Sequence, residues 1–163
     1  MSVPNISAQK SLLKGLQVIY KKLFQNAIIW FLDSDSSTLD SVYDESSKKV
    51  YTNGKEVLSH FMRTRSKDSD PIKETEEKVT FKFPIQEFLD KDIPFVSNDD
   101  LEILRKCLVE FNGQYYYVEE VNPYSMVAGQ YLVCEFHCQI ADANELEFVV
   151  EDSTEGLGES QNV

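Results

Sequence analysis

The amino-acid sequence predicts a mainly β (α+β) protein: a small antiparallel β-barrel or sandwich with an amphipathic N-terminal helix and a disordered acidic C-terminal tail. Two Asn-Gly dipeptides, at residues 53–54 and 112–113, are typical of two-residue hairpin turns. Residues 130–140 alternate between polar and apolar side chains, as a half-buried strand does. Residues 7–24 instead repeat apolar side chains every three or four positions, which indicates one helix before the strands. A chain of 163 residues suits one domain with its own core.

The N-terminal segment, residues 1–26, is predicted to be helical over residues 7–24, with Ser7 as its cap. Gly15 in the interior costs about 1 kcal/mol relative to Ala. We therefore expect packing against the body or against another subunit to hold the segment helical. The apolar stripe consists of Leu12, Leu16, Ile19, Tyr20, Leu23 and Phe24.

The β domain is predicted to span residues 27–150. The run 27–31 is apolar and rich in strand formers, whereas the Asp- and Ser-rich stretch that follows favours a loop. In order, we predict a strand at 27–31, a long loop at 33–47, a hairpin of 48–52 with 56–64 around Asn53-Gly54, and an exposed loop at 64–78.

The rest of the domain begins with a strand at 78–83, in which Val79, Phe81 and Phe83 share one face. After it we predict a helical turn with Pro84 at its first position and a second helical turn capped by Asn98. A strand at 106–111 is then joined by Asn112-Gly113 to a strand at 114–121. A loop at 121–129 leads to the last predicted strand, at 130–140. Residues 151–163 carry four acidic and no basic residues, which predicts a disordered tail.

Charge divides the molecule into two parts. Residues 1–32 contain four Lys and no acid, whereas the remaining chain has 12 basic against 28 acidic residues, a net charge of −16. This excess of acid argues against nucleic-acid binding, because such affinity comes largely from Lys and Arg. The basic end suggests docking onto a negatively charged partner, such as another copy of the chain; a helix face that is merely solvated is the alternative.

Nothing in residues 1–32 marks the chain for export or for a bilayer, since there is no apolar run of about 18 residues and no small-residue cleavage site. We expect a soluble, intracellular protein. Its three cysteines are too few for a disulfide framework and are predicted to be free thiols.

Cys134, His137 and Cys138 are close in sequence, but they are not predicted to bind a metal. On a strand the two cysteines point to one face and His137 to the other, so they cannot share one tetrahedral ion. Small buried cysteines are the preferred interpretation. No local signature of nucleophilic catalysis surrounds His60 or His137, and we predict no catalytic, cofactor-binding or metal-binding residue.

Two stretches, residues 38–64 and 104–141, carry a family resemblance. In "LDSVYDE", Leu39, Asp40, Tyr43 and Glu45 match a Leu-Asp-x-x-Tyr-x-Glu loop, and a short turn later precedes an aromatic-rich strand with a Val-x-x-Val edge. In these features the chain resembles the head-completion proteins of the tailed-bacteriophage neck, also called head-closure or stopper proteins.

The resemblance implies a non-enzymatic virion protein of the phage neck, assembled in the host cytoplasm. It would form a homo-oligomeric ring between a portal or adaptor protein and a tail or tail-terminator protein, closing or extending a channel through which DNA passes without specific binding, and it would have no membrane partner. The interface candidates are Lys10, Lys14, Leu16, Tyr20 and Lys21 in the helix, Leu39, Asp40, Tyr43 and Glu45 in the loop, and Tyr116 and Tyr131 in the strands.

Three alternatives stay open at this point. A tail terminator or another connector ring belongs to the same class. An acidic monomer that mimics DNA and inhibits a nucleic-acid enzyme predicts carboxylates spaced regularly along one exposed face. A hydrolase would require a pocket that holds His60 or His137 beside a nucleophile.

Overall fold

The computed structural model describes residues 6–34, 49–65, 77–127 and 130–149. Strands dominate these residues, so the mainly β prediction is confirmed. The helices are α1 (Ile6–Leu23), α2 (Ile85–Asp90) and α3 (Asn98–Arg105), with a 3-10 turn η1 (Ala143–Glu145). The strands are β1 (Gln25–Leu32), β2 (Lys49–Arg65), β3 (Glu77–Pro84), β4 (Leu108–Phe111), β5 (Gln114–Val127), β6 (Gln130–Ile140) and β7 (Leu146–Phe148).

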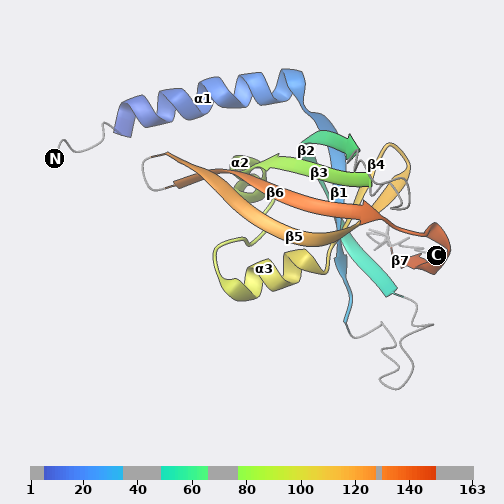
Figure 1. Ribbon diagram of the computed structural model, residues 1–163. Coiled ribbons are helices and arrows are strands. Elements are labelled where there is room, and N and C mark those ends of the chain that lie inside the picture. Colours follow the sequence, from blue (N-terminus) through green and yellow to red (C-terminus); the bar gives the residue numbers. More distant parts are fainter. Residues whose placement is uncertain (1–5, 35–48, 66–76, 128–129, 150–163) are drawn as a thin grey trace, which may run out of the picture.

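The strands form one sheet in the order β1-β4-β5-β6-β3-β2-β7 (Figure 1). β1 also pairs with β2, so the sheet curls until its first strand meets its sixth. The curling is irregular, because β1 meets β4 only through Ile28, Ile29 and Trp30 and because β7 adds parallel to the start of β2. The other pairings are antiparallel, which makes the sheet mainly antiparallel but not a regular barrel.

The main core lies on the face of the sheet to which Val79, Phe81 and Phe83 point, as their alternation in the sequence predicted. α2 contributes Phe88 to this core and α3 contributes Leu104. Full burial of one such side chain stabilises the fold by about 1.5–3 kcal/mol. The two short helices are therefore held in place by the same core that holds the strands.

A second, smaller core lies on the opposite face of β5. Tyr115 and Tyr117 alternate with Tyr116 along this strand, and they pack beside the buried Tyr51. Phe148 of β7 covers them, with its ring centroid 5.0 Å from that of Tyr115. Both faces of the tyrosine run are thus covered within this chain, whereas the sequence had left one face free for a partner.

The predicted hairpin at Asn53-Gly54 is wrong. β2 runs unbroken from Lys49 to Arg65, and both of its halves pair with β1. Asn53 has a φ of 51°, but together Asn53 and Gly54 oppose the single residue Trp30, which makes a β-bulge rather than a turn. A Cβ at Gly54 would lie 2.8 Å from the Trp30 ring, so this position requires the close approach that only glycine allows.

The second Asn-Gly dipeptide is a hairpin turn, as predicted: Asn112 and Gly113 have φ values of 49° and 75° between β4 and β5. The predicted loop at 121–129 is wrong, because β5 continues to Val127 and pairs with β6 throughout. At Pro123 β5 has only β6 beside it among the described strands, because β4 pairs only with the first four residues of β5, so no second strand depends on the missing N–H.

Several predicted element ends shift. α1 begins at Ile6, so Ser7 lies inside its first turn, and Pro84 precedes α2 instead of opening it. Ser97 rather than Asn98 caps α3, through a capping box in which Ser97 Oγ accepts from the Asp100 N–H at 3.1 Å. The strand expected from Lys106 begins at Leu108. Most of the predicted loops at 33–47 and 64–78, and all of the tail at 151–163, lie outside the described residues.

Candidate functional site

α1 is the helix that stands off the curled sheet (Figure 1). Leu12, Leu16, Ile19 and Leu23 recur at steps of four, three and four residues, so they lie along one face, called here the α1 stripe. Leu12, Ile19 and Leu23 are 50%, 49% and 67% exposed. A stripe of this kind normally packs against a core, and the described part of the body leaves most of it open.

Lysines give the same helix a positive charge. Lys21 and Lys22 lie in its last turn, where cations interact favourably with the helix dipole, and its first turn carries no acid. α1 therefore offers a partner both apolar area and positive charge.

The helix is fixed to the body at its C-terminal end. The Tyr20 ring lies 4.8 Å from that of Phe24, which in turn lies 5.5 Å from the His60 ring on β2. A small hollow beside this contact is lined by Tyr20, Lys21, Leu58, Pro84, Gln86, Glu87 and Asp90. The last turn of α1 thus rests near α2.

The structure places the predicted interface residues unevenly. Leu16, Tyr20, Lys14, Lys21 and Lys10 belong to α1. Tyr131 is 42% exposed on β6. The loop candidates Leu39, Asp40, Tyr43 and Glu45 lie outside the described residues.

Tyr116 is not available as an interface residue. It is only 6% exposed, and its ring packs in the main core 5.3 Å from Phe81. The error arose because three consecutive tyrosines place aromatic groups on both faces of a strand, and the sequence does not say which face another part of the chain will cover.

The chain has a second exposed surface that the sequence analysis did not single out, the α2–α3 segment (residues 85–105). Its Leu89, Val96 and Ile103 are 54%, 85% and 49% exposed. The segment contains six acidic residues against Lys91 and Arg105, a net charge of −4. The sequence pattern that could have indicated this surface is the placement of each of these apolar residues within three positions of an acidic residue.

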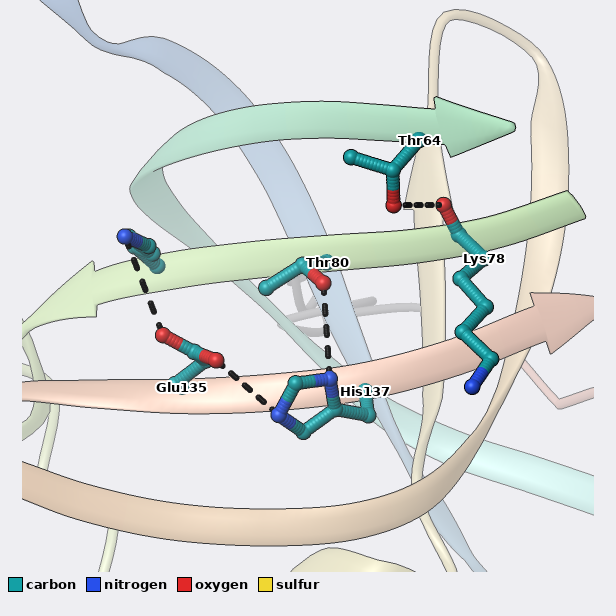
Figure 2. Close-up of polar contacts among 6 residues, drawn as sticks. Thr64, Lys78, Thr80, Glu135 and His137 are labelled. Carbon is teal, nitrogen blue, oxygen red and sulfur yellow. Dashed lines mark hydrogen bonds and ion pairs between the residues drawn. The ribbon is translucent and has the colours of Figure 1, made fainter. Parts of the chain in front are cut away.

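The outer face of the sheet carries a polar cluster (Figure 2). His137 Nε2 lies 2.9 Å from Glu135 Oε1, and His137 Nδ1 lies 3.4 Å from the Thr80 hydroxyl. Lys82 Nζ lies 3.8 Å from the other Glu135 oxygen. The order hydroxyl, imidazole, carboxylate resembles a catalytic relay, but the groups line up across paired strands on an open face. Thr80 with His137 and Lys82 with Glu135 are cross-strand pairs, and we interpret them as stabilising the β3–β6 ladder, with His137 and Glu135 linking the two pairs along β6.

The cysteines behave as the strand periodicity predicted. Cys134 and Cys138 are buried in the main core with Cys107, all three as free thiols, while His137 lies on the outer face. Burial raises the pKa of the Cys134 thiol to about 12, with a smaller contribution from the charge of Glu135. Among the described residues there is no group of three or more side chains placed to hold a metal ion.

Comparison with known proteins gives no relative: no protein-family model matches the chain, and no curated protein matches it. Within the part of the chain that the structure describes, no helix has the length and apolar character needed to cross a membrane. The function is therefore inferred from the surfaces described above.

Proposed function

We propose that this protein is a non-enzymatic structural subunit that works by assembly, as the phage neck proteins that it resembles in sequence do. In this proposal the curled sheet serves as a barrel-like body and α1 docks on a neighbouring subunit. The assembled ring would join portal to tail and extend the DNA channel. The observation that carries the proposal is the exposed α1 stripe on a helix that stands off the sheet.

The energetics of α1 favour a partner. Covering the exposed half of one Leu or Ile side chain contributes about 1 kcal/mol. A protein helix owes most of its stability to packing of its apolar face, and Gly15 weakens α1 further. A neighbouring subunit that covers the α1 stripe would stabilise the helix and the assembly together.

The distribution of charge favours a ring or a chain over a symmetric dimer. The positive α1 and the negative body are different surfaces, so contact between them is head-to-tail, and a head-to-tail contact closes into a ring when its rotation permits. An acidic ring lumen would also repel phosphate and allow DNA to slide through it.

The assembly state of the full chain tests the proposal. We expect native mass spectrometry and sedimentation to show oligomers that the double substitution Leu12→Ser, Ile19→Ser converts to monomers. The matched control is Ile140→Ser, Val149→Ser, which removes two side chains of similar exposure elsewhere and should leave assembly intact. Circular dichroism checks that each variant keeps its sheet.

The biological setting needs a separate experiment. Proteomics of purified phage particles that encode the chain should detect it in virions, and electron microscopy should place it at the neck. A wild-type chain that stays monomeric at every concentration, and is absent from particles, would exclude the proposal. An acidic inhibitor would instead bind a basic enzyme as a monomer, indifferent to changes in the α1 stripe.

A further inference from the structure

Most of the exposed large apolar side chains of the described residues belong to two segments of the chain. Of the ten such residues, four lie on α1 and three lie on the α2–α3 segment. The other three are spread over β6 and the end of β7. Single exposed apolar residues need no explanation, but concentrations of them mark surfaces that a partner covers.

The two places have opposite and matching charges. Residues 6–24 carry four Lys and no acid, a charge of +4, while the α2–α3 segment carries −4. At physiological salt, charges are screened beyond about 8 Å. Local charge therefore decides which surfaces attract, and these two are complementary in sign and in size.

The α2–α3 segment is already ordered by buried residues within its own chain. Exposed Leu89 follows the fully buried Phe88, and exposed Ile103 precedes the fully buried Leu104. The capping box of Ser97 and Asp100 fixes the start of α3. Because the buried neighbours anchor both helices, their outward side chains are presented without further ordering, which lowers the entropic cost of binding.

A chain does not cover its own α1 stripe with its own α2–α3 segment. Only the last turn of α1 comes near α2, where Tyr20 and Lys21 line the hollow with Glu87 and Asp90. Leu12 and Ile19, about three turns and one turn before Leu23, remain half exposed, and α1 stands off the sheet on the side opposite α3 (Figure 1). A second molecule is therefore needed to bury the exposed part of the α1 stripe.

We propose that α1 of one copy docks on the α2–α3 segment of a second copy. This inference rests on the proposed function and names the partner surface of the same helix. Each copy then offers one helix and accepts one helix, so the contact is heterologous and propagates around a ring.

Two other occupants fit the charges less well. Pairing of α1 with α1 brings +4 against +4. An anionic membrane attracts α1 but repels the rest of the chain, which carries −16. The body of a second copy is acidic too, but its α2–α3 segment offers α1 opposite local charge and exposed apolar side chains together.

Reciprocal charge reversal in the full chain tests the pairing. The helix variant is Lys14→Glu, Lys22→Glu, and the segment variant is Asp99→Lys, Glu102→Lys, which spares the cap residue Asp100. Sedimentation velocity at low salt should show that either variant alone assembles only at a concentration about tenfold higher or more. An equimolar mixture should assemble as the wild type does, because each reversed surface then meets a complementary one.

The control reverses the same number of charges elsewhere on the body, by Glu119→Lys on β5 and Glu145→Lys in η1, and should leave assembly unchanged. Loss of assembly in the helix variant with none in the segment variant would overturn this inference while the proposed function stands. Failure of the mixture to recover would overturn it as well. Binding of the wild type to phosphatidylserine vesicles that the helix variant loses and the segment variant keeps would identify a membrane as the partner of α1. A wild type that never assembles would remove both proposals.

Discussion

At the residue scale, Trp30 of β1 is the side chain that contacts three neighbouring strands, β2, β4 and β7. Its indole N–H donates to Glu110 at 2.8 Å, the centroid of its ring lies 5.0 Å from that of Phe148, and its ring atoms lie against Gly54. At the bulge in β2, Asn53 and Gly54 together lie opposite the bulky Trp30 side chain. A side chain at Gly54 would compete with the indole for the same space.

Gly54→Ala is therefore expected to destabilise the fold by about 1–3 kcal/mol, because a Cβ would overlap the Trp30 ring and force it to move. Urea unfolding followed by circular dichroism measures the change. Gly15→Ala is the matched control, since nothing lies within 4 Å of its Cβ position, and it should instead raise helicity slightly. Equal effects of the two substitutions would contradict the packing assigned to Trp30.

The buried thiols give a second prediction at this scale. Burial raises the pKa of the Cys134 thiol from 9.0 to about 12, so the folded state holds the proton more tightly than the unfolded state. Its contribution to stability is complete below pH 9 and is lost as the pH rises from 9 toward 12. At pH 8 we expect a thiol reagent to modify none of the three cysteines in the folded chain and all of them in urea. Rapid reaction in the folded chain would contradict their burial.

The start of α3 allows a sharp comparison at the scale of the element. Ser97→Ala should cost about 1 kcal/mol, because it removes the side-chain acceptor for the Asp100 N–H, whereas Asn98→Ala should be nearly neutral. The Ser97 N–H also holds the pKa of the Asp100 carboxyl below its ordinary value. That contribution is present at neutral pH and is lost as the pH falls through the lowered pKa. Urea unfolding at pH 7 should show the difference between Ser97→Ala and Asn98→Ala, and the Asp100 contribution should persist in Ser97→Ala because Ala keeps the backbone N–H at position 97.

The elements also show what the sequence could predict. Alternation fixed the faces of β3 and β6 correctly, and the spacing of Leu12, Leu16, Ile19 and Leu23 predicted α1, because these signals extend over many residues. The two Asn-Gly dipeptides are locally alike, yet one forms a turn and the other a bulge. The difference lies in Trp30 and β1, which are distant in sequence and which pair with both sides of Asn53-Gly54.

The candidate site was predicted in part for a related reason. The amphipathic pattern identified α1, but a pattern states only that one face is apolar and not whether the same chain covers it. Tyr116 was misplaced because Phe61 of β2 and Phe81 of β3, which are distant in sequence, cover its face of β5 in the main core. The α2–α3 segment was missed because the sequence does not show that Phe88 and Leu104, rather than their neighbours Leu89 and Ile103, are the residues buried in the core.

At the scale of the whole molecule, the two cores stabilise different parts of the fold. The main core joins β1 through β6 with α2 and α3, whereas the second core depends on β7, a strand of three residues at the end of the sheet. Short edge strands open at a lower free energy than the central sheet. The second core is therefore expected to open locally while the main core stays folded.

Phe136→Ala and Phe148→Ala should separate the two cores. Phe136 is fully buried, so its loss should cost about 3–5 kcal/mol, a large share of the stability of a domain of this size. Phe148 is only partly buried and contacts Trp30, Tyr51 and Tyr115, so its loss should release β7 and leave the sheet intact. Trp30 is the single tryptophan, and its fluorescence reports this contact directly. In Phe148→Ala we expect the emission to shift toward that of a solvent-exposed indole while the far-ultraviolet circular dichroism is unchanged. A loss of both signals together would show that β7 folds as one unit with the main core.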